Sequence, residues 1–264
     1  MLVHFSKYHG TGNDFIMVDG REQETSHFDT SHIQRLCDRR FGIGADGLII
    51  LEESQNFDFT MRYFNADGRE GTMCGNGGRC ITAFAKRLGM VSKNSTFEGI
   101  DGSHEASFLP NGEIRLKLVD VSGIKELEDG YLLDTGSPHF VTLVESLEEI
   151  DVEHKGAEIR HQARFGPGGV NVNFMETGSA SHKISVRTFE RGVEGETWSC
   201  GTGVTAAAIT SCFQSGSDIF SYDVQTRGGM LNVSFKMEDR QHFTDIYLSG
   251  SASHVYDGSI EIIV

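Results

Sequence analysis

Two cysteines occur in the same short pattern, Cys-Gly-x-Gly, in two distant parts of the chain. The first copy spans Cys74–Gly77 and the second spans Cys200–Gly203. Each copy leads into a proline-free run with apolar residues at helical spacing, residues 79–88 and 204–213, which predicts a helix. Each thiol is therefore expected at a helix N-terminus, where exposed N–H groups and the helix dipole favour the thiolate.

Two such thiols suit one kind of chemistry. A carbon acid is inverted when a base removes its proton from one face and an acid returns a proton to the other face. A thiolate and a thiol can run this reaction in both directions, because they only exchange roles. N–H groups at the two helix starts can bind a carboxylate and the negative charge that builds up as the α-proton leaves. The pattern predicts Cys74 and Cys200 as an acid/base pair.

Other interpretations of the cysteines stay open at this point. Cys37, Cys80 and Cys212 lack the glycine context and are interpreted as small buried residues. Cys74 and Cys200 could instead be structural, or could pair reversibly in a redox protein without catalytic activity. Cys-Gly-x-Gly is not the Cys-x-x-Cys of dithiol oxidoreductases. Thiol titration at neutral pH separates these cases, because catalytic thiols should react fast.

The sequence offers no pattern for a metal or a nucleotide cofactor. It has no Cys-x-x-Cys or His-x-x-x-His pair, so no metal site is predicted. The glycine loops at residues 42–44 and 166–168 lack the six-residue dinucleotide fingerprint, and no Walker-type lysine follows a glycine loop. The sequence itself therefore gives no indication of a bound metal or nucleotide.

Composition limits the partners and the location of the protein. The 264 residues allow one large domain or two of about 130 residues. The 38 acidic and 23 basic residues give a net charge of −15, which argues against a nucleic-acid partner. Apolar runs are too short for a membrane span and the N-terminus lacks the features of a secretory signal. Five sparse cysteines indicate a reducing, cytoplasmic setting. A homodimer stays open as the assembly state.

Local patterns predict strands and helices along the first half of the chain. A helix is expected over 31–40, with Thr30 or Ser31 as its N-cap and basic residues in its last turn. Strands are expected over 1–9, 14–19, 48–51 and 58–64, with several more between 94 and 118.

The second half of the chain repeats the first at a nearly constant offset. The short sequence patterns at residues 11–13 and 41–44 recur 124 positions later, and the pattern at 62–64 recurs 125 positions later. The cysteine pattern recurs at an offset of 126. Four matches in the same order indicate an internal duplication. The fold class is therefore α+β with two homologous halves. The first half covers 1–120 with a C-terminal strand at about 251–264, and the second covers 121–250. Joined face to face, they would place the two thiols across a common cleft.

These motifs resemble diaminopimelate epimerase. The likeness runs from about residue 6 to 258 and rests on four runs: Gly10–Phe15, Phe64–Gly68, Met73–Cys80 and Phe189–Gly203. The resemblance implies halves that are each a curled, mostly antiparallel sheet around a central helix, with strand 259–264 returning to the first half. It implies a cofactor-independent isomerase that interconverts LL- and meso-diaminopimelate, for lysine and peptidoglycan synthesis. The alternative is a relative that acts on another small amino acid, such as proline or hydroxyproline.

The resemblance also implies roles for individual residues. Cys74 and Cys200 would be the acid/base pair, with His139 as a supporting residue near the thiols. The groups expected to bind the α-carboxylate are Gly75, Asn76, Gly201 and Thr202. The groups expected to hold the far end of the substrate are Asn13, Asn65, Asn171 and Arg191, and Glu190 is expected to bind the substrate's amino group or to tune a thiol. This second set makes chemical sense because diaminopimelate carries a second amino-acid head, which a guanidinium, amides and a carboxylate can bind. A substrate without that head would leave Arg191, Glu190 and Asn171 unused.

The chain departs from the family pattern at three places. Ser137 stands where the family often has Asn before Pro-His, and Gly47 stands where some members have Gln. Ser137 reaches less far than the amide that it replaces, and Gly47 removes a possible polar contact, so both changes affect the expected recognition of the far end of the substrate. Gly250-Ser251-Ala252 replaces an expected Gly-Pro-Ala and is interpreted as a structural change only.

Overall fold

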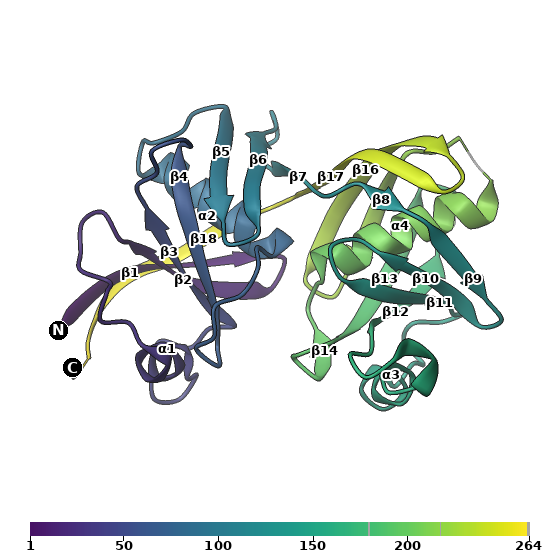
Figure 1. Ribbon diagram of the computed structural model, residues 1–264, viewed down its shortest axis with the longest axis horizontal. Coiled ribbons are helices and arrows are strands. Elements are labelled where there is room, and N and C mark those ends of the chain that lie inside the picture. Colours follow the sequence, from purple (N-terminus) through teal and green to yellow (C-terminus); the bar gives the residue numbers. More distant parts are fainter. Residues whose placement is uncertain (179, 217, 263–264) are drawn as a thin grey trace. The chain divides into compact units, whose positions relative to one another are not determined.

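The computed structural model describes residues 1–178, 180–216 and 218–262. The chain divides into two compact units, Met1–Leu116 with Ser251–Val264, and Lys117–Gly250. Each unit combines a mixed sheet with two α-helices (Figure 1). The last two residues of the strand expected over 259–264 lie outside the described residues. None of the helices in the described part of the chain has both the length and the apolar character needed to cross a membrane.

Unit 1 follows one strand order, β18-β1-β2-β3-β4-β5-β6-β7. Its strands are β1 (Leu2–Gly10), β2 (Asn13–Asp19), β3 (Gly47–Glu52), β4 (Phe59–Asn65), β5 (Asn94–Gly99), β6 (Gly102–Phe108), β7 (Ile114–Lys117) and β18 (Ser253–Glu261). Its helices are α1 (Thr30–Cys37), between β2 and β3, and α2 (Gly75–Arg87), between β4 and β5. The C-terminal strand β18 is antiparallel to β1, so both ends of the chain meet in this unit.

Unit 2 contains the remaining elements. Its strands are β8 (Val121–Ser122), β9 (Ile124–Leu127), β10 (Gly130–Asp134), β11 (Pro138–Leu143), β12 (Asn171–Thr177), β13 (Lys183–Glu190), β14 (Gly195–Thr197), β15 (Ser221–Thr226), β16 (Gly229–Asp239) and β17 (His242–Gly250). Its helices are α3 (Val152–Arg160), α4 (Gly201–Ser215) and the short 3-10 helix Ala163–Phe165.

The two units repeat one topology. From β1 to β7, successive pairings are antiparallel, parallel, antiparallel, parallel, antiparallel and antiparallel. The series β10, β11, β12, β13, β15, β16 follows the same alternation, and β16 is then antiparallel to β17. The helices enter at equivalent points, α1 with α3 and α2 with α4. The predicted fold class and the internal duplication are confirmed.

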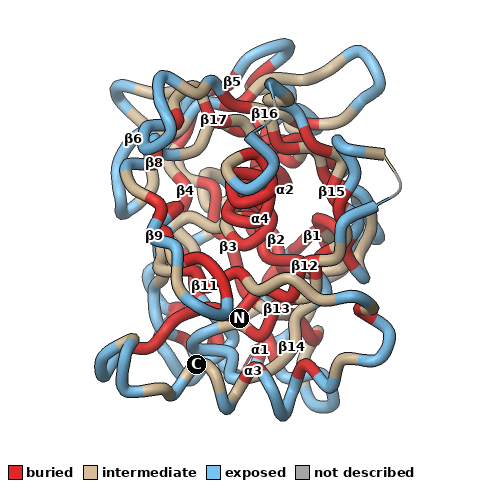
Figure 2. The backbone as a smooth tube through the Cα atoms, turned by 90° about the vertical axis from the view of Figure 1, so that its right-hand side faces the viewer, coloured by how far each residue is buried: buried red, intermediate tan, exposed pale blue. Residues whose placement is uncertain are grey.

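The central helix of each unit is enclosed by that unit's strands. Helix α4 is buried from Gly201 to Cys212 except at Thr202, and packs in one core with residues of strands β8 to β13 and β15 to β17 (Figures 1 and 2). Helix α2 is buried over most of its length as well. A helix that is apolar on all sides must lie in a core, and the alanine- and threonine-rich sequence of α4 allows strands to approach it closely.

Helix α1 begins one residue before the predicted start. Its N-cap is Asp29, whose carboxylate accepts the His32 N–H at 2.9 Å. Thr30 or Ser31 was predicted to cap this helix, and both predictions are wrong. A carboxylate satisfies the free N–H groups of the first turn and also favours the positive end of the helix dipole.

Helix α1 ends at Cys37 rather than at Arg40. Asp38 is extended, and its carboxylate accepts the N–H groups of Arg40 and Phe41, each at 2.7 Å. This local turn competes with the helix for those N–H groups. As a result, Arg39 leaves the helix and its guanidinium binds the carboxylates of Asp14 and Asp46.

Helix α3 lies unusually close to strand β13 at one glycine. A Cβ atom on Gly156 would lie 2.3 Å from the Cβ of Phe189, which is 2% exposed. The obstacle is the base of a side chain in a strand, not a flexible tip, so it cannot move aside cheaply. The close approach holds the end of β13, where Glu190 and Arg191 follow Phe189.

We predict that Gly156→Ala destabilises the protein. Alanine is favoured over glycine in a helix by about 1 kcal/mol, but overpacking of a core contact costs about 1–3 kcal/mol, so the clash should prevail. Urea unfolding measures the difference, with the exposed Lys155→Ala in the same helix as control. A gain in stability for Gly156→Ala would show that α3 can move away from β13.

Candidate active site

The first thiol is held at the start of α2. Cys74 is the N-cap of the helix, and its Sγ accepts the Gly77 N–H at 3.2 Å. A Cβ atom on Gly77 would lie 3.1 Å from that sulfur and 3.0 Å from Ile49. The glycine three residues after the cysteine is therefore what lets the sulfur lie over the first turn, where N–H groups favour a thiolate.

The second thiol lies at the equivalent place at the start of α4, but its side chain makes no capping hydrogen bond to the first turn. Cys200 is the N-cap of the helix and is 7% exposed. A Cβ atom on Gly203 would lie 3.3 Å from its Sγ and 2.4 Å from Asn173 Oδ1. The Sγ of Cys200 also lies 3.5 Å from the Thr202 hydroxyl. The second glycine of each Cys-Gly-x-Gly pattern thus has the same steric role in both units.

The other three cysteines lie in the core, as the sequence indicated. Cys37, Cys80 and Cys212 are at most 4% exposed. Burial raises the pKa of Cys37 to about 12 and also raises the pKa of Cys80. The thiols of Cys37 and Cys80 therefore stay protonated at neutral pH and are unsuited to acid/base work.

In unit 1, the predicted residues Asn13 and Asn65 lie at the ends of strands, on either side of the start of β3. Asn13 begins β2, Gly47 begins β3 and Asn65 ends β4. Strands β2 and β3 are parallel with Phe15 opposite Gly47, and Gly47 is opposite Asn65 in the antiparallel β3–β4 pair. Asn13 and Asn65 therefore lie at one end of the sheet, although 52 positions separate them in the sequence.

Asn13 reaches the first turn of α2. The Asn76 Nδ2 donates to Asn13 Oδ1 at 3.2 Å, and the Asn76 Oδ1 accepts from Arg79 at 2.9 Å. The fully buried Arg79 also donates to the Gly75 carbonyl at 3.1 Å. The structure thus brings Asn13, Asn76 and Cys74 to the same end of unit 1.

Unit 2 has its predicted residues at the equivalent strand ends. His139 lies at the start of β11 and is paired with Asn171, the first residue of β12. Glu190 is the last residue of the adjacent strand β13. Because β11, β12 and β13 correspond to β2, β3 and β4, the polar residues of both units stand at equivalent edges.

Asn171 forms hydrogen bonds with neighbouring residues at this end of the sheet. Its Oδ1 accepts the Arg191 N–H at 2.8 Å, and its Nδ2 donates to the Ser137 hydroxyl at 3.0 Å and to the Pro138 carbonyl at 3.2 Å. In the structure, Asn171 fixes the backbone at Arg191. Its direct contact with substrate stays a prediction. Ser137, where Asn was expected, belongs to this local network.

His139 is connected to Cys200 through Thr202. Asn173 fixes the tautomer of the imidazole, because the Phe140 carbonyl can only accept and so identifies the Asn173 nitrogen, which donates to that carbonyl and to His139 Nδ1, each at 3.1 Å. The hydrogen of His139 is then on Nε2, which lies 2.9 Å from Thr202 Oγ1. A Thr202 hydroxyl that accepts from His139 can direct its own hydrogen to the Cys200 sulfur.

The absence of a glutamine at position 47 has a steric explanation. A Cβ atom on Gly47 would lie 2.6 Å from the ring of Tyr63 and 2.6 Å from the Phe64 carbonyl. The ring of Tyr63 fills this space, and its hydroxyl donates to Asn65 Oδ1 at 2.8 Å. A polar contact to Asn65 is therefore present, but it comes from β4 instead of β3.

Sequence reasoning missed several residues of this site. Asn173 carried no motif signal, and Tyr63 belonged to the repeated pattern at 62–64 without an assigned role, because the contacts with His139 and Gly47 come from other strands. Arg79 was noticed only as part of a predicted helix. Among the residues that the structure describes, no group of three or more metal-ligating side chains was found.

The chain matches known proteins along its whole length. The family described as "Diaminopimelate epimerase" matches residues 5–119 and 131–255. A diaminopimelate epimerase from Flavobacterium psychrophilum is 47% identical over 96% of this chain and 98% of the relative. One from Chlorobaculum tepidum is 43% identical over 96% and 99%. The chain belongs to the diaminopimelate epimerase family. It is therefore an isomerase of the epimerase type.

Solved structures share the fold at low sequence identity. A phenazine biosynthesis protein of the PhzF family from Bacillus anthracis has a TM-score of 0.79 at 16% identity and covers 99% of this chain and 100% of its own. A hydroxyproline epimerase from Agrobacterium vitis, solved with trans-4-hydroxy-L-proline, has a TM-score of 0.71 at 13% identity, with 98% and 92% covered. At these identities the likeness shows the fold alone.

We predict a pH-dependent stability from His139. Burial lowers the pKa of His139 from its ordinary 6.5 to about 3, and the charge of Arg191 acts in the same direction. The hydrogen bond from Asn173 raises this pKa but does not outweigh the burial. The unfolded chain takes up this proton below about pH 6.5 while the native protein does not, so the stabilisation is present above about pH 6.5 and lost as pH falls toward 3. The unfolding free energy, measured with urea at pH 7, 6 and 5, gives the number of protons taken up on unfolding. This number should be about one smaller for His139→Asn than for the wild type. An equal pH slope in both proteins would contradict a buried neutral histidine.

Proposed function

We propose that the chain interconverts LL- and meso-diaminopimelate without a cofactor, using Cys74 and Cys200 as a thiolate/thiol pair. The observation that carries this proposal is the duplicated helix start, with each thiol as N-cap and a glycine three residues later that leaves room for its sulfur. Membership of the family and the names of the relatives support the substrate. The product would serve lysine biosynthesis.

The proposed reaction moves one proton off the α-carbon and one onto it. The thiolate on one face takes the α-proton, so the C–H bond breaks, an S–H bond forms and the electron pair moves toward the carboxylate. The thiol on the opposite face then gives its proton to the α-carbon, which inverts the centre. The enzyme ends with the protonation states of its two cysteines exchanged, ready for the reverse direction.

The first turns of α2 and α4 are suited to hold the α-carboxylate. The N–H groups of Gly75 and Asn76, and those of Gly201 and Thr202, belong to helix starts, where anions bind. Such fixed dipoles stabilise the charge that develops as the proton leaves. In this proposal Asn13, Asn65, Asn171, Glu190 and Arg191 bind the far amino-acid head, and His139 supports Cys200 through Thr202.

A related epimerase acting on proline or hydroxyproline is the second candidate. One fold neighbour is a hydroxyproline epimerase, but such a substrate has no second head for Arg191 and Glu190 to bind. The substrate is therefore the point on which the two candidates differ, and one assay can compare them.

We predict that purified protein with reductant and no added cofactor exchanges the α-proton of LL-diaminopimelate in D2O and forms the meso isomer. Proton NMR follows both the loss of the α-proton signal and the change of isomer. Exchange with proline or hydroxyproline alone would favour the second candidate. No exchange with any of these substrates would contradict both.

We predict that Cys74→Ala and Cys200→Ala each lower the rate of epimerisation by about 10²–10⁴-fold, the contribution of one acid/base group. Cys80→Ala is the matched control, because Cys80 lies in the same helix as Cys74 and is fully buried. The control should keep its rate per folded protein. Full activity in either Cys74→Ala or Cys200→Ala would rule out the two-thiol mechanism.

A further inference from the structure

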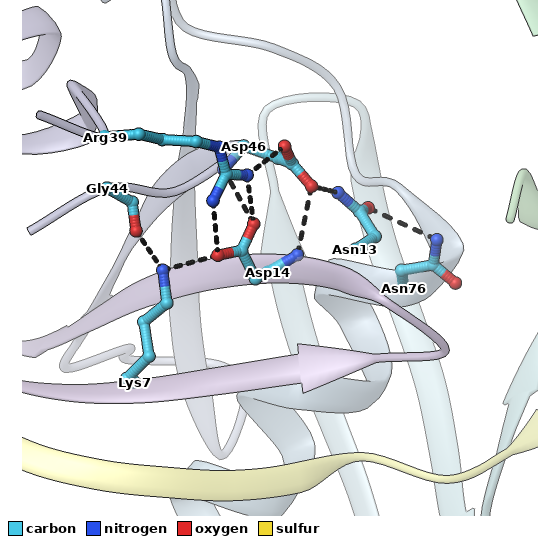
Figure 3. A network of polar contacts seen from close by, with 7 residues as sticks. All are labelled: Lys7, Asn13, Asp14, Arg39, Gly44, Asp46 and Asn76. Carbon is cyan, nitrogen blue, oxygen red and sulfur yellow. Dashed lines mark hydrogen bonds and ion pairs between the residues drawn. The ribbon is translucent and has the colours of Figure 1, made fainter. Parts of the chain in front are cut away.

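A cluster of four charged side chains lies beside the turn that carries Asn13. Lys7 on β1 forms an ion pair with Asp14 at 2.6 Å and donates to the Gly44 carbonyl (Figure 3). Arg39 donates to the carboxylates of both Asp14 and Asp46 at 2.7 Å. Lys7 and Asp14 are only 8% and 18% exposed. Burial works against ionisation of Asp14, but the bonds from Arg39 and Lys7 prevail and hold its pKa at about 2.

The carboxylate of Asp46 connects this cluster to Asn13. One oxygen, Oδ1, accepts from Arg39, while the other, Oδ2, accepts from Asn13 Nδ2 at 2.7 Å and from the Asp14 N–H at 3.1 Å. The backbone of Asp46 is fixed as well. Its N–H donates to the Asp14 carbonyl at 2.9 Å and its carbonyl accepts the Ala66 N–H at 3.1 Å. Asp46 is thus held between the strand that begins with Asn13 and the turn that follows Asn65.

The contacts at both ends determine how the two amides are oriented. The guanidinium of Arg79 can only donate, so the atom of Asn76 that faces it must be the oxygen. Asn76 Nδ2 then donates to Asn13, whose facing atom must also be its oxygen. The carboxylate of Asp46 can only accept, which requires Asn13 Nδ2 on its side. Arg79, which can only donate, and Asp46, which can only accept, therefore require the same orientation of the two amides. Figure 3 shows the contacts from Asp46 through Asn13 to Asn76.

We infer that Asp46 is a positioning residue that holds Asn13 in the orientation needed to bind substrate. Asp46 takes one of the two Nδ2 hydrogens of Asn13, and no described residue accepts the other. Asn13 therefore presents an N–H to a ligand, which suits a carboxylate oxygen and rejects an ammonium group. This inference rests on the proposed function for the identity of the ligand, a diaminoacid with a carboxylate at this position. Arg39, in turn, holds Asp46.

The inference predicts that Asp46 acts on catalysis through Asn13. Asp46→Ala should lower kcat/KM for LL-diaminopimelate by about 10- to 100-fold, the size of one lost hydrogen bond to a charged group. The larger part should appear in KM, because the far end of the substrate is bound alike in the ground and transition states. The matched control is Asp19→Ala. Asp19 lies in β2, the strand that begins with Asn13, and the substitution removes its carboxylate from the ion pair with Arg21. It should stay within about twofold of the wild type.

A double-mutant cycle separates positioning from a general structural role. If Asp46 acts through Asn13, the double variant Asn13→Ala/Asp46→Ala should be no worse than Asn13→Ala alone. Losses that multiply would overturn the inference. Asp46→Asn, which keeps an oxygen for Asn13, provides the second test where Asp46→Ala fails to fold. It should retain more activity than Asp46→Ala when both fold, and its Asn13 amide should keep the hydrogen bond.

Side-chain amide NMR tests the inference without turnover. In the free enzyme, one Asn13 Nδ2 hydrogen should show the downfield shift of a charge-assisted hydrogen bond, assigned by its loss in Asn13→Ala. The shift should disappear in Asp46→Ala and persist in Asp19→Ala. Persistence in Asp46→Ala would overturn the inference. If the wild type fails to epimerise diaminopimelate while this signal behaves as expected, the proposed substrate is wrong and the positioning of Asn13 stands.

Discussion

Both units depend on one contact, the close approach of a cysteine sulfur to the glycine three residues later in the first turn of a helix. The contact requires a missing side chain, because a Cβ atom on Gly77 or Gly203 would approach the sulfur to 3.1 or 3.3 Å. Both units build this helix start with the same order of parallel and antiparallel strand pairs. The duplicated topology is thus a way to build one thiol environment twice.

The two copies differ in how they fix the groups around the thiol. Unit 1 uses full charges, with the buried Arg79 at one end of a chain of amides and Asp46 at the other. Unit 2 uses neutral groups, with Asn173, an uncharged His139 and the Thr202 hydroxyl in sequence. Both arrangements fix hydrogen positions through residues whose donor or acceptor character is certain. Similar backbones therefore carry unrelated polar networks.

The sequence alone predicted the features that are local or repeated. The helix starts at Cys74 and Cys200 and the duplication follow from short glycine words at a constant offset, because the backbone geometry they serve is local. The predicted end of α1, at Arg40, was wrong because the carboxylate of Asp38 competes for the backbone N–H groups that follow it. The pairing of Gly47 with the Tyr63 ring could not be predicted, since it depends on the register of β3 against β4. Contacts between strands determine the site beyond its thiols.

The difference between the units is clearest at one equivalent position, 126 residues apart, where Arg79 corresponds to Thr205. Both side chains donate to the carbonyl of the glycine that follows the cysteine, at 3.1 Å from Arg79 to Gly75 and at 2.9 Å from Thr205 to Gly201. Burial lowers the pKa of Arg79, and a buried charge without a partner is costly. No carboxylate of the described residues accepts a hydrogen bond from Arg79, so oxygens of neutral groups solvate it. The positive charge therefore adds to the dipole at the start of α2 and favours an anion there. A threonine would satisfy the same carbonyl at less cost, so the arginine at this position is explained by the amide of Asn76 that it orients and by the anion that it favours.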